Sequence, residues 1–378
     1  MPGGDDLTIH VICDEAEWDA IRPEWSALYS ACPRASTPLD HAWLRAWWQV
    51  FGATYGAGGL RIVTMWRASQ LIAALPLYVG SGHGDRFGMR VVRFLSTGEA
   101  EDEEICPDYL DLLARPGEEA ACVPAAWREV GAWEWDQLEW LDLPADSPLL
   151  RTGAAPGGAD VFDRGACLIA DLTGGFEGYL GRLSSSGRQQ ARHLIREGEA
   201  SGALFEIVEA DRAGLAFDDL CRLHQKRWAA DGKPGVFAAP RFVAFHRQII
   251  EQWVPTGRAV LARLDLNGEP VAVLYGFITG GKFDFYQSGV RLDAGVALRS
   301  PGNLAHLRLM QALSARGVTA YDFLRGASSY KERLATREVG LAGVRVWRST
   351  PRAIAARARQ FVARTVRRSA TPAKERPS

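Results

Sequence analysis

Residues 282–324, KFDFYQSGVRLDAGVALRSPGNLAHLRLMQALSARGVTAYDFL, contain the signals of a strand, a helix and a second strand, in that order. Lys282–Ser288 alternates between two faces, as a half-buried strand does. Pro301–Arg316 has the apolar spacing of a helix, and Gly317 is a typical stop after its last turn. Val318–Leu324 alternates again. The order predicts one α/β unit.

A hairpin is predicted directly before this unit. Asn267-Gly268 lies between the apolar runs Ala259–Leu266 and Val271–Thr279. Asn-Gly between two such runs is a strong hairpin signal, because both residues tolerate the positive φ of the tight turn.

The first half of the chain repeats this order. It has a predicted hairpin, a helix and an alternating strand, at Arg61–Val79, Glu118–Val130 and Gln137–Leu143. The two helices also start alike, with Arg115-Pro116-Gly117-Glu118 in the first half and Ser300-Pro301-Gly302-Asn303 in the second. We therefore predict a tandem repeat of one α/β unit.

A linker divides the two predicted repeats. Arg151–Asp160, RTGAAPGGAD, is rich in Gly, Ala and Pro and has little to bury. We expect domains over residues 7–150 and 161–350, followed by a basic tail over residues 351–378. Two helices with several tryptophans, Glu15–Tyr29 and His41–Phe51, are expected to cover the first sheet. Most of the thirteen tryptophans should fill the two cores.

Composition excludes several classes of protein. The chain has 378 residues, 47% hydrophobic and 24% charged, which is ordinary for a globular protein of about two domains. A net charge of −1 gives no general attraction to DNA. Six scattered cysteines indicate neither a disulfide framework nor a zinc site. Without a signal peptide or a long apolar run, we expect a soluble cytoplasmic protein.

Charge is unevenly distributed along the chain, with an acidic segment in the first half and a basic tail at the end. Residues 99–111 carry seven carboxylates and no basic residue. We interpret them as a solvated acidic surface and expect no metal, because their spacing is not that of a calcium loop. Residues 351–378 carry eight basic residues and one acidic residue, a net charge of +7. This tail is either plainly solvated or an amphipathic helix that contacts anionic lipid.

The start of the predicted helix at Pro301 is a candidate phosphate site. Ser300 is a good N-cap and Pro301 suits the first helical turn. The amides of Gly302, Asn303 and Leu304 can then point at an anion, and Arg299 adds a full charge. An ordinary capped helix explains the same residues. In the first repeat, Glu118 and Glu119 would repel an anionic ligand.

Asp322, in the strand after this helix, is the leading candidate for a chemical role. A carboxylate in such a strand is costly to bury unpaired. It either pairs with a cation, for which Arg325 and Lys331 are near in sequence, or lies at a cleft with the raised pKa of a general base. The loop that follows contains Tyr330 and Lys331 and ends a strand, where α/β folds commonly bind ligands.

Two other basic or polar patterns are candidates for substrate binding. The predicted helix Gly187–Glu197 carries Arg188, Arg192 and Arg196 at intervals of four, which makes a cationic face or merely a solvated one. Leu223–Trp228, LHQKRW, brings His224 and Trp228 to the end of another helix. A lone histidine is more often structural than catalytic.

Four of these stretches together resemble a known family. They are YDFLRGASSYKER at residues 321–333, SPGNLAHLRLMQALSARG at 300–317, LHQKRW at 223–228 and SGRQQARHLIREGEASG at 186–202. The chain resembles the GNAT-type acyltransferases of the cellulose-biosynthesis (CelD/BcsL) family, which is similar in turn to the FemAB-like peptidyltransferases. The resemblance covers roughly residues 15–347.

The resemblance implies a fold and a donor. The fold would be α/β (α+β), with two tandem GNAT-like domains, each a mixed, mainly antiparallel twisted sheet flanked by helices. The donor would be acyl-CoA, with its pyrophosphate at the helix start near Ser300 and its pantetheine arm between Lys282–Ser288 and Val318–Leu324. This sequence has only one glycine where the family's phosphate loop has two small residues, which leaves an aminoacyl-tRNA donor open.

We therefore expect an N- or O-acyltransferase acting in polysaccharide or cell-envelope biosynthesis. A backbone amide of Tyr286 or Gln287 would stabilise the oxyanion, and Asp322 would help deprotonate the acceptor. Tyr330 or Tyr286 would return a proton to the leaving group, and Lys331 is a further catalytic candidate. A small-molecule or saccharide acceptor would lie in the cleft between the repeats. The alternatives are an aminoacyl-tRNA-dependent transferase and a non-catalytic binding protein of an envelope-polymer complex.

Overall fold

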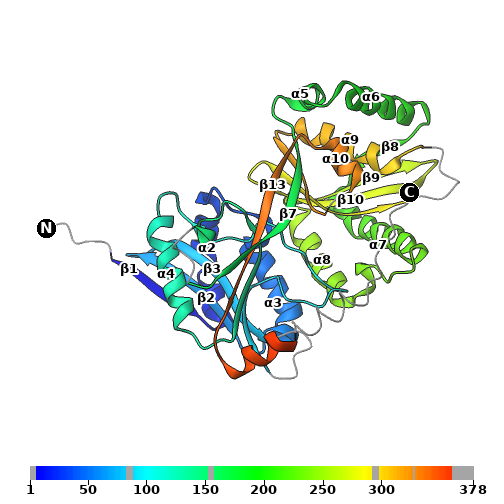
Figure 1. The fold of residues 1–378 in the computed structure, drawn as a ribbon. Coiled ribbons are helices and arrows are strands. Elements are labelled where there is room, and N and C mark those ends of the chain that lie inside the picture. Colours follow the sequence, from blue (N-terminus) through cyan, green and yellow to red (C-terminus); the bar gives the residue numbers. More distant parts are fainter. Residues whose placement is uncertain (1–5, 82–87, 152–156, 292–297, 327, 360–378) are drawn as a thin grey trace, which may run out of the picture.

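The computed structural model describes residues 6–81, 88–151, 157–291, 298–326 and 328–359 (Figure 1). The first half contains the elements β1 Leu7–Ile12, α1 Glu15–Ala20, α2 Arg22–Ala31, α3 His41–Tyr55, β2 Leu60–Arg67, β3 Gln70–Ser81, β4 Arg90–Phe94, β5 Leu113–Ala114, α4 Glu119–Ala132 and β6 Gln137–Pro144.

The second half is longer by a helical hairpin near its start. It contains the elements β7 Asp160–Asp171, α5 Gly175–Arg182, α6 Ser185–Ala200, β8 Leu204–Ile207, α7 Ala213–Ala230, α8 Pro240–Trp253, β9 Ala259–Leu266, β10 Glu269–Thr279, β11 Lys282–Val290, α9 Pro301–Ser314, β12 Ala320–Arg325, α10 Ser329–Leu334 and β13 Arg337–Trp347.

The strands confirm the predicted repeat. In the first half, β1, β2, β3 and β4 pair antiparallel in sequence order, and β6 then pairs parallel to β4. In the second half, β8, β9, β10 and β11 pair antiparallel in the same way, and β12 pairs parallel to β11. A helix connects each parallel pair, α4 in one half and α9 in the other, as a parallel connection requires.

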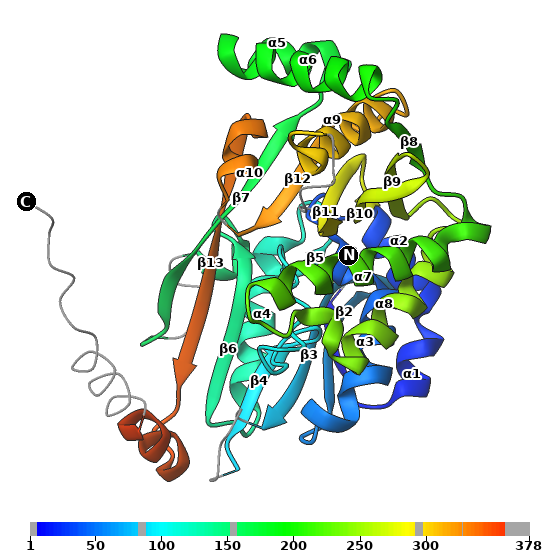
Figure 2. The ribbon, with the colours of Figure 1, turned by 90° about the vertical axis from the view of Figure 1, so that its right-hand side faces the viewer.

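The two halves are joined by an exchange of long strands. β7, which follows the first half, pairs with β12 of the second half, whereas β13, the last strand, pairs with β6 of the first half. β7 and β13 also pair with each other along most of their length. Figures 1 and 2 show them side by side between the halves. The described strands therefore form a single sheet.

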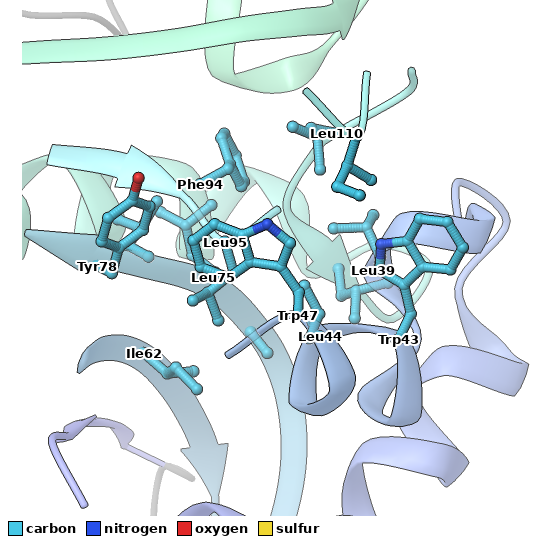
Figure 3. Packing of buried hydrophobic residues seen from close by; sticks show 14 of the residues in the cluster. Leu39, Trp43, Leu44, Trp47, Ile62, Leu75, Tyr78, Phe94, Leu95 and Leu110 are labelled. Atoms are coloured by element: carbon cyan, nitrogen blue, oxygen red, sulfur yellow. The ribbon is translucent and has the colours of Figure 1, made fainter. Parts of the chain in front are cut away.

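Aromatic side chains fill the core of the first half and continue into the second. Trp47 of α3 lies near Phe94 and packs against Tyr78, with ring centroids 5.3 Å apart, whereas Trp43 lies beside Leu39 (Figure 3). The ring of Trp43 also packs edge-on against Phe245 of α8, with ring centroids 4.8 Å apart. The helices α3 and α8 thus bury a common apolar layer between the halves, which fixes the geometry of any site formed there.

Local signals place most elements correctly. Asn267 and Gly268 have φ angles of 53° and 79°, as the tight turn between β9 and β10 requires. The predicted helix Glu15–Tyr29 is instead two helices, α1 and α2, divided at Ile21. The break precedes Pro23, which has no amide hydrogen to continue a helix from the preceding turn.

The helices of the second half lie on two faces of its sheet. α7 and α8 face the first half, whereas α9 covers the opposite face. α5 and α6 lie outside α9, at the edge of the molecule (Figure 2). Leu304 of α9 packs so close to α6 that a Cβ at Gly198 would lie 2.5 Å from its methyl group.

Candidate functional site

The parallel strands β11 and β12 separate part-way along their length. They pair from Lys282 with Ala320 to Asp284 with Asp322 and then diverge. On its other side, β11 has a β-bulge against β10, where Gln287 pairs with Tyr275 and Phe285 pairs with Gly276. Tyr286 therefore has no partner position on either neighbouring strand, and the ladder is locally disrupted at this residue.

A cavity of about 230 Å³ lies where the strands have separated. We call it the splay cavity. Side chains and backbone of both strands, of α10 and of the first half line it: Glu104, Cys106, Asp108, Tyr286, Gln287, Phe323, Leu324, Arg325, Gly326 and Lys331. Three residues predicted from the sequence, Tyr286, Gln287 and Lys331, thus meet at one place.

A buried ionic cluster fixes the point at which the strands separate. Lys282 Nζ lies 2.7 Å from Asp284 Oδ1 and 3.1 Å from Asp322 Oδ2. The first half completes the cluster, because the Tyr109 hydroxyl donates to Asp322 at 2.6 Å and the Thr37 hydroxyl donates to Asp284 at 2.9 Å. Two facing carboxylates would repel each other without the shared lysine.

The cluster decides between the two alternatives considered for Asp322. The side chain is fully buried and pairs with a cation, which is Lys282 rather than Arg325 or Lys331. Burial would lower the pKa of Lys282, but the charges of Asp284 and Asp322 outweigh it and raise that pKa. Burial raises the pKa of Asp284. Asp322 lies beneath the splay cavity and is not among the residues described as lining it.

Lys331 closes the end of β12. Its ammonium donates to the carbonyl oxygens of Phe323 and Arg325, at 2.7 and 3.1 Å. Between them, Leu324 has a φ of 56°, a conformation that costs a non-glycine residue energy. Burial lowers the pKa of the Lys331 amine. Through its hydrogen bonds to Phe323 and Arg325, Lys331 holds the strained end of β12 that borders the cavity.

A second and larger hollow, of about 800 Å³, lies between the halves. We call it the inter-half cleft. Its lining joins an acidic segment of the first half to α7, the loop after α7 and β11: Glu101, Asp102, His224, Arg227, Trp228, Lys233, Pro234, Gly235, Val236, Gln287 and Ser288. Gln287 lines both hollows, so the cleft and the splay cavity are adjacent. His224 and Trp228, both predicted to bind substrate, lie here.

The two predicted tyrosine acids are held differently. The Tyr286 hydroxyl donates to the carbonyl of Ile105 at 2.7 Å and lies 3.1 Å from His246 Nε2, so it is engaged with its neighbours. The Tyr330 ring stacks on His306 at 5.3 Å. Burial raises the pKa of Tyr330 to about 12.

The predicted phosphate site at the start of α9 is partly occupied by the protein itself. The backbone N–H of Arg299 donates to the Glu197 carboxylate of α6 at 2.8 Å. Ser300 is the N-cap residue of α9, as predicted, but its side chain makes no capping bond. Gly302 is half-buried, Leu304 is buried, and Asn303 lines a separate hollow beside α6.

The cationic face of α6 lies elsewhere. Arg192 is exposed and pairs with Glu177 of α5 at 3.0 Å. Within the described residues, neither Arg188 nor Arg192 lines the splay cavity or the inter-half cleft. The structure therefore separates these arginines from His224 and Trp228, with which they were grouped as substrate-binding candidates.

The acidic segment 99–111 is not the solvated surface that we expected. Glu99, Glu103, Asp108 and Asp111 are buried, since this segment crosses the interior between the halves. Three of them pair with arginines: Glu103 with Arg241, Asp108 with Arg325 and Asp111 with Arg34. Burial raises the pKa of Asp108, which lines the splay cavity, to about 6. In the described residues, no three His, Cys, Asp or Glu side chains are arranged to hold a metal.

The geometry agrees with the comparison to protein families. Residues 185–332 match an acetyltransferase (GNAT) domain. The match spans α6 to α10 and so includes β11, β12 and the second-half residues that line both hollows. No curated protein sequence matches the chain.

Solved structures show the same fold over nearly the whole chain. FemX superposes with a TM-score of 0.54 at 11% identity, covering 89% of this chain and 96% of the other. The C-terminal domain of a putative lysylphosphatidylglycerol synthetase from Agrobacterium fabrum gives 0.53 at 16% identity, with 91% and 96% covered. A protein of unknown function from Bacteroides thetaiotaomicron gives 0.53 at 12%, with 90% and 100% covered. The predicted fold class, two tandem GNAT-like units, is confirmed.

Sequence reasoning missed the residues that organise the site. Lys282, Thr37 and Tyr109 were not identified, because only the folded chain brings them to Asp322. The spacing Lys282-x-Asp284 at a strand start was the one available signal, since it puts opposite charges on one face.

No described helix is long and apolar enough to be a candidate membrane span.

Proposed function

We propose that this protein is an acyltransferase that moves an acyl group to an amine or hydroxyl acceptor at the splay cavity. The observation that carries the proposal is the coincidence of the bulge at Tyr286 with the separation of β11 from β12. Where the ladder is disrupted beside a cavity, a backbone amide can donate to a substrate carbonyl oxygen.

The reaction needs a donor of hydrogen bonds to the developing oxyanion. The backbone amide of Tyr286 or Gln287 takes this role, since both residues line the cavity. A fixed amide dipole stabilises the tetrahedral intermediate without reorganising, and one such donor is typically worth about 100- to 1000-fold in turnover. The acyl carbon then lies at the bulge. The acceptor approaches from the inter-half cleft, past Gln287, which lines both hollows.

The remaining residues act by holding this arrangement. Asp322 is buried and receives hydrogen bonds from Tyr109 and from the Leu324 amide, which supports a positioning role at the point of separation. Lys331 holds the end of β12. Tyr330 remains a candidate for returning a proton to the leaving group.

The donor is either acyl-CoA or aminoacyl-tRNA. Both present an activated acyl group that the splay cavity could take. The start of α9 does not fit the pyrophosphate of CoA well, because Glu197 already accepts the Arg299 amide and its charge would repel a phosphate. We therefore assign no step to the CoA moiety. The fold shared with FemX supports testing aminoacyl-tRNA with equal weight.

We further propose that the acceptor belongs to polysaccharide or cell-envelope biosynthesis. The resemblance to the CelD/BcsL acyltransferases and the names of the structural neighbours FemX and putative lysylphosphatidylglycerol synthetase support this setting. The relation to the CelD/BcsL family itself stays a prediction.

A panel of donors tests the function. The purified chain is incubated with acetyl-CoA, palmitoyl-CoA or alanyl-tRNA and a mixture of amino sugars, and acylated products are identified by mass spectrometry. We expect one donor class to yield product. Isothermal titration in parallel addresses the non-catalytic alternative. If no donor binds and no product forms, the acyltransferase proposal is wrong and a binding role is favoured.

A further inference from the structure

A hydrogen-bond relay from the loop after α7 fixes the proton on His224. The Gln225 side-chain Nε2 donates to the carbonyl of Pro234 at 2.6 Å. Because that nitrogen faces an acceptor, the other end of the amide is the oxygen, and Gln225 Oε1 lies 3.2 Å from His224 Nδ1. An oxygen can only accept, so Nδ1 carries the hydrogen and Nε2 carries the free lone pair.

The backbone of the same loop is shaped for this relay. Gly235 has a φ of 68°, and a Cβ at this position would collide with Gln225 Oε1. Only glycine therefore lets the loop close over the amide. The Gln225 side chain is held in place by this close approach as well as by its bond to Pro234.

A second glycine brings His224 to the reacting strand. A Cβ at Gly289 of β11 would lie 2.6 Å from the Leu220 carbonyl oxygen and 3.2 Å from the His224 backbone nitrogen. α7 therefore lies directly on β11. His224 is 5% exposed, and it lines the inter-half cleft together with Gln287 and Ser288.

The surroundings favour a neutral imidazole. Burial lowers the pKa of His224; the hydrogen bond to Gln225 acts to raise it, but burial together with the positive charge of Arg227 outweighs that bond. Lys233 also lines the cleft, whereas Glu101 and Asp102 are the acidic groups there. A neutral ring with a defined lone pair is the form that accepts a proton.

We infer that His224, with its Nε2 lone pair set by Gln225 and Pro234, is the general base that deprotonates the acceptor in the inter-half cleft. This inference rests on the proposed acyl transfer. The acceptor N–H or O–H gives its proton to Nε2 as its lone pair attacks the acyl carbon. The bond from that carbon to the donor's sulfur or oxygen then breaks, and the leaving group takes up the proton that the imidazolium releases.

Two nucleophiles test this role. Acetyl-CoA and alanyl-tRNA are each supplied with glycinamide, whose attack is helped by a base, or with hydroxylamine, which is strongly nucleophilic and unprotonated at neutral pH. In His224→Asn we expect transfer to glycinamide to fall by about 100-fold or more, while transfer to hydroxylamine stays near the wild-type rate. His10→Asn, on the outer strand β1, is the matched control and should change neither rate.

The possible outcomes distinguish a failure of the proposed His224 role from a failure of the proposed acyl transfer. Equal losses with both nucleophiles in His224→Asn, or no loss with either, would overturn the catalytic role while leaving acyl transfer intact. If the wild-type chain acylates neither nucleophile from either donor, the proposed function is contradicted and the inference falls with it.

The tautomer provides a readout that needs no activity. In the nitrogen-15 NMR spectrum of the full chain, His224 should show the Nδ1–H form, and Gln225→Met should lose this preference. A spectrum in which wild-type His224 carries its hydrogen on Nε2 would overturn the inference regardless of the kinetics.

Discussion

The two halves share one strand order but treat the gap in the parallel pair differently. In the first half, β4 and β6 pair at Val92 with Leu138 and then separate. Arg93 of β4 and Glu139 of β6 form an ion pair across the opening at 3.4 Å, and Arg345 of β13 bonds to the same carboxylate at 2.6 Å. In the second half, the corresponding opening holds the splay cavity, bordered by Tyr286 and Leu324.

The N-terminal ends of α4 and α9, the helices that connect the parallel strands, also differ between the halves. Glu118 at the start of α4 pairs with Arg67, so that tip is already neutralised. On the helix side of the first opening, Trp140 packs against Phe94 and Trp127 with ring centroids 5.4 and 4.5 Å apart. In the described residues, side chains thus bridge the first-half opening, whereas a cavity lies at the strand separation of the second half, and the first half supplies residues that hold it.

The largest expected effect comes from removing the shared cation of the second half. In Lys282→Met, Asp284 and Asp322 face each other buried and without a positive charge. We expect a loss of about 3–5 kcal/mol in the free energy of unfolding, the usual result of breaking a buried pair by removing one partner. Urea denaturation measures this loss.

Two further variants sharpen this result. Arg345→Met, on β13 at the first-half opening, should cost much less, because Arg93 still pairs with Glu139. The triple variant Lys282→Met, Asp284→Asn, Asp322→Asn should recover most of the stability, since no buried charge remains. Equal losses in Lys282→Met and Arg345→Met would contradict the contrast between the halves.

In the first half, Glu99 is a buried carboxyl group that is not paired with a cation in the described residues, and its protonation can be tested. It accepts a hydrogen bond from the Trp47 indole, and burial raises its pKa to about 8. A raised pKa means that the folded protein binds a proton that the unfolded chain has lost. This contribution to stability is therefore present below about pH 4.5 and disappears as the pH rises through 8.

The variant Glu99→Gln removes that titration and keeps an acceptor for Trp47. Relative to the wild type, it should gain stability on the order of 3 kcal/mol at pH 8 and nothing near pH 4.5. Thermal unfolding across this pH range gives the comparison. A difference between the two proteins that does not change with pH would show that Glu99 is ionised in the fold.

Lys331 tests whether the strained end of β12 matters for the reaction. Lys331→Met should reduce acyl transfer by about 100-fold, because a small displacement of positioning groups has effects of that size. Lys331→Arg should restore part of the rate. Arg345→Met, at the first-half opening, should leave turnover unchanged. Normal turnover in Lys331→Met would remove the lysine from the site.

The smallest expected effect concerns the tail beyond β13. Residues 351–359 are helical, and Ala356 packs on Met89 and Val91 of the first half. Residues 360–378, outside the described part, add five basic residues and one acidic residue. Deleting residues 360–378 should reduce sedimentation with anionic liposomes if the tail contacts lipid. Equal sedimentation of both proteins would dismiss that contact.

Local signals predicted the repeat but not the way its halves join. Pro301, Gly317 and Asn267-Gly268 act through their own backbone, so the helix and hairpin positions could be predicted from them. The exchange of β7 and β13 depends on pairing between segments far apart in the sequence. No local pattern encodes such pairing.

The candidate site was predictable to the same limited extent. Tyr286, Gln287 and Lys331 were identified from strand and loop positions, and His224 and Trp228 from the end of a helix. The neutralisation of Asp322 by Lys282 was not, because a lysine at a strand start resembles any solvated lysine. Likewise, the proton position on His224 depends on the Pro234 carbonyl, nine residues beyond Gln225 in the chain.

Photo-crosslinking tests the central claim most directly. An acyl donor with a diazirine in its acyl chain, carried on CoA or on tRNA, is bound to the full chain, irradiated and located by peptide mass spectrometry. The account predicts labelling of residues 286–288, 323–326 or 331 in the second half. Labelling of residues 93–97 or 139–142 at the first-half opening, or no labelling from either donor, would contradict it.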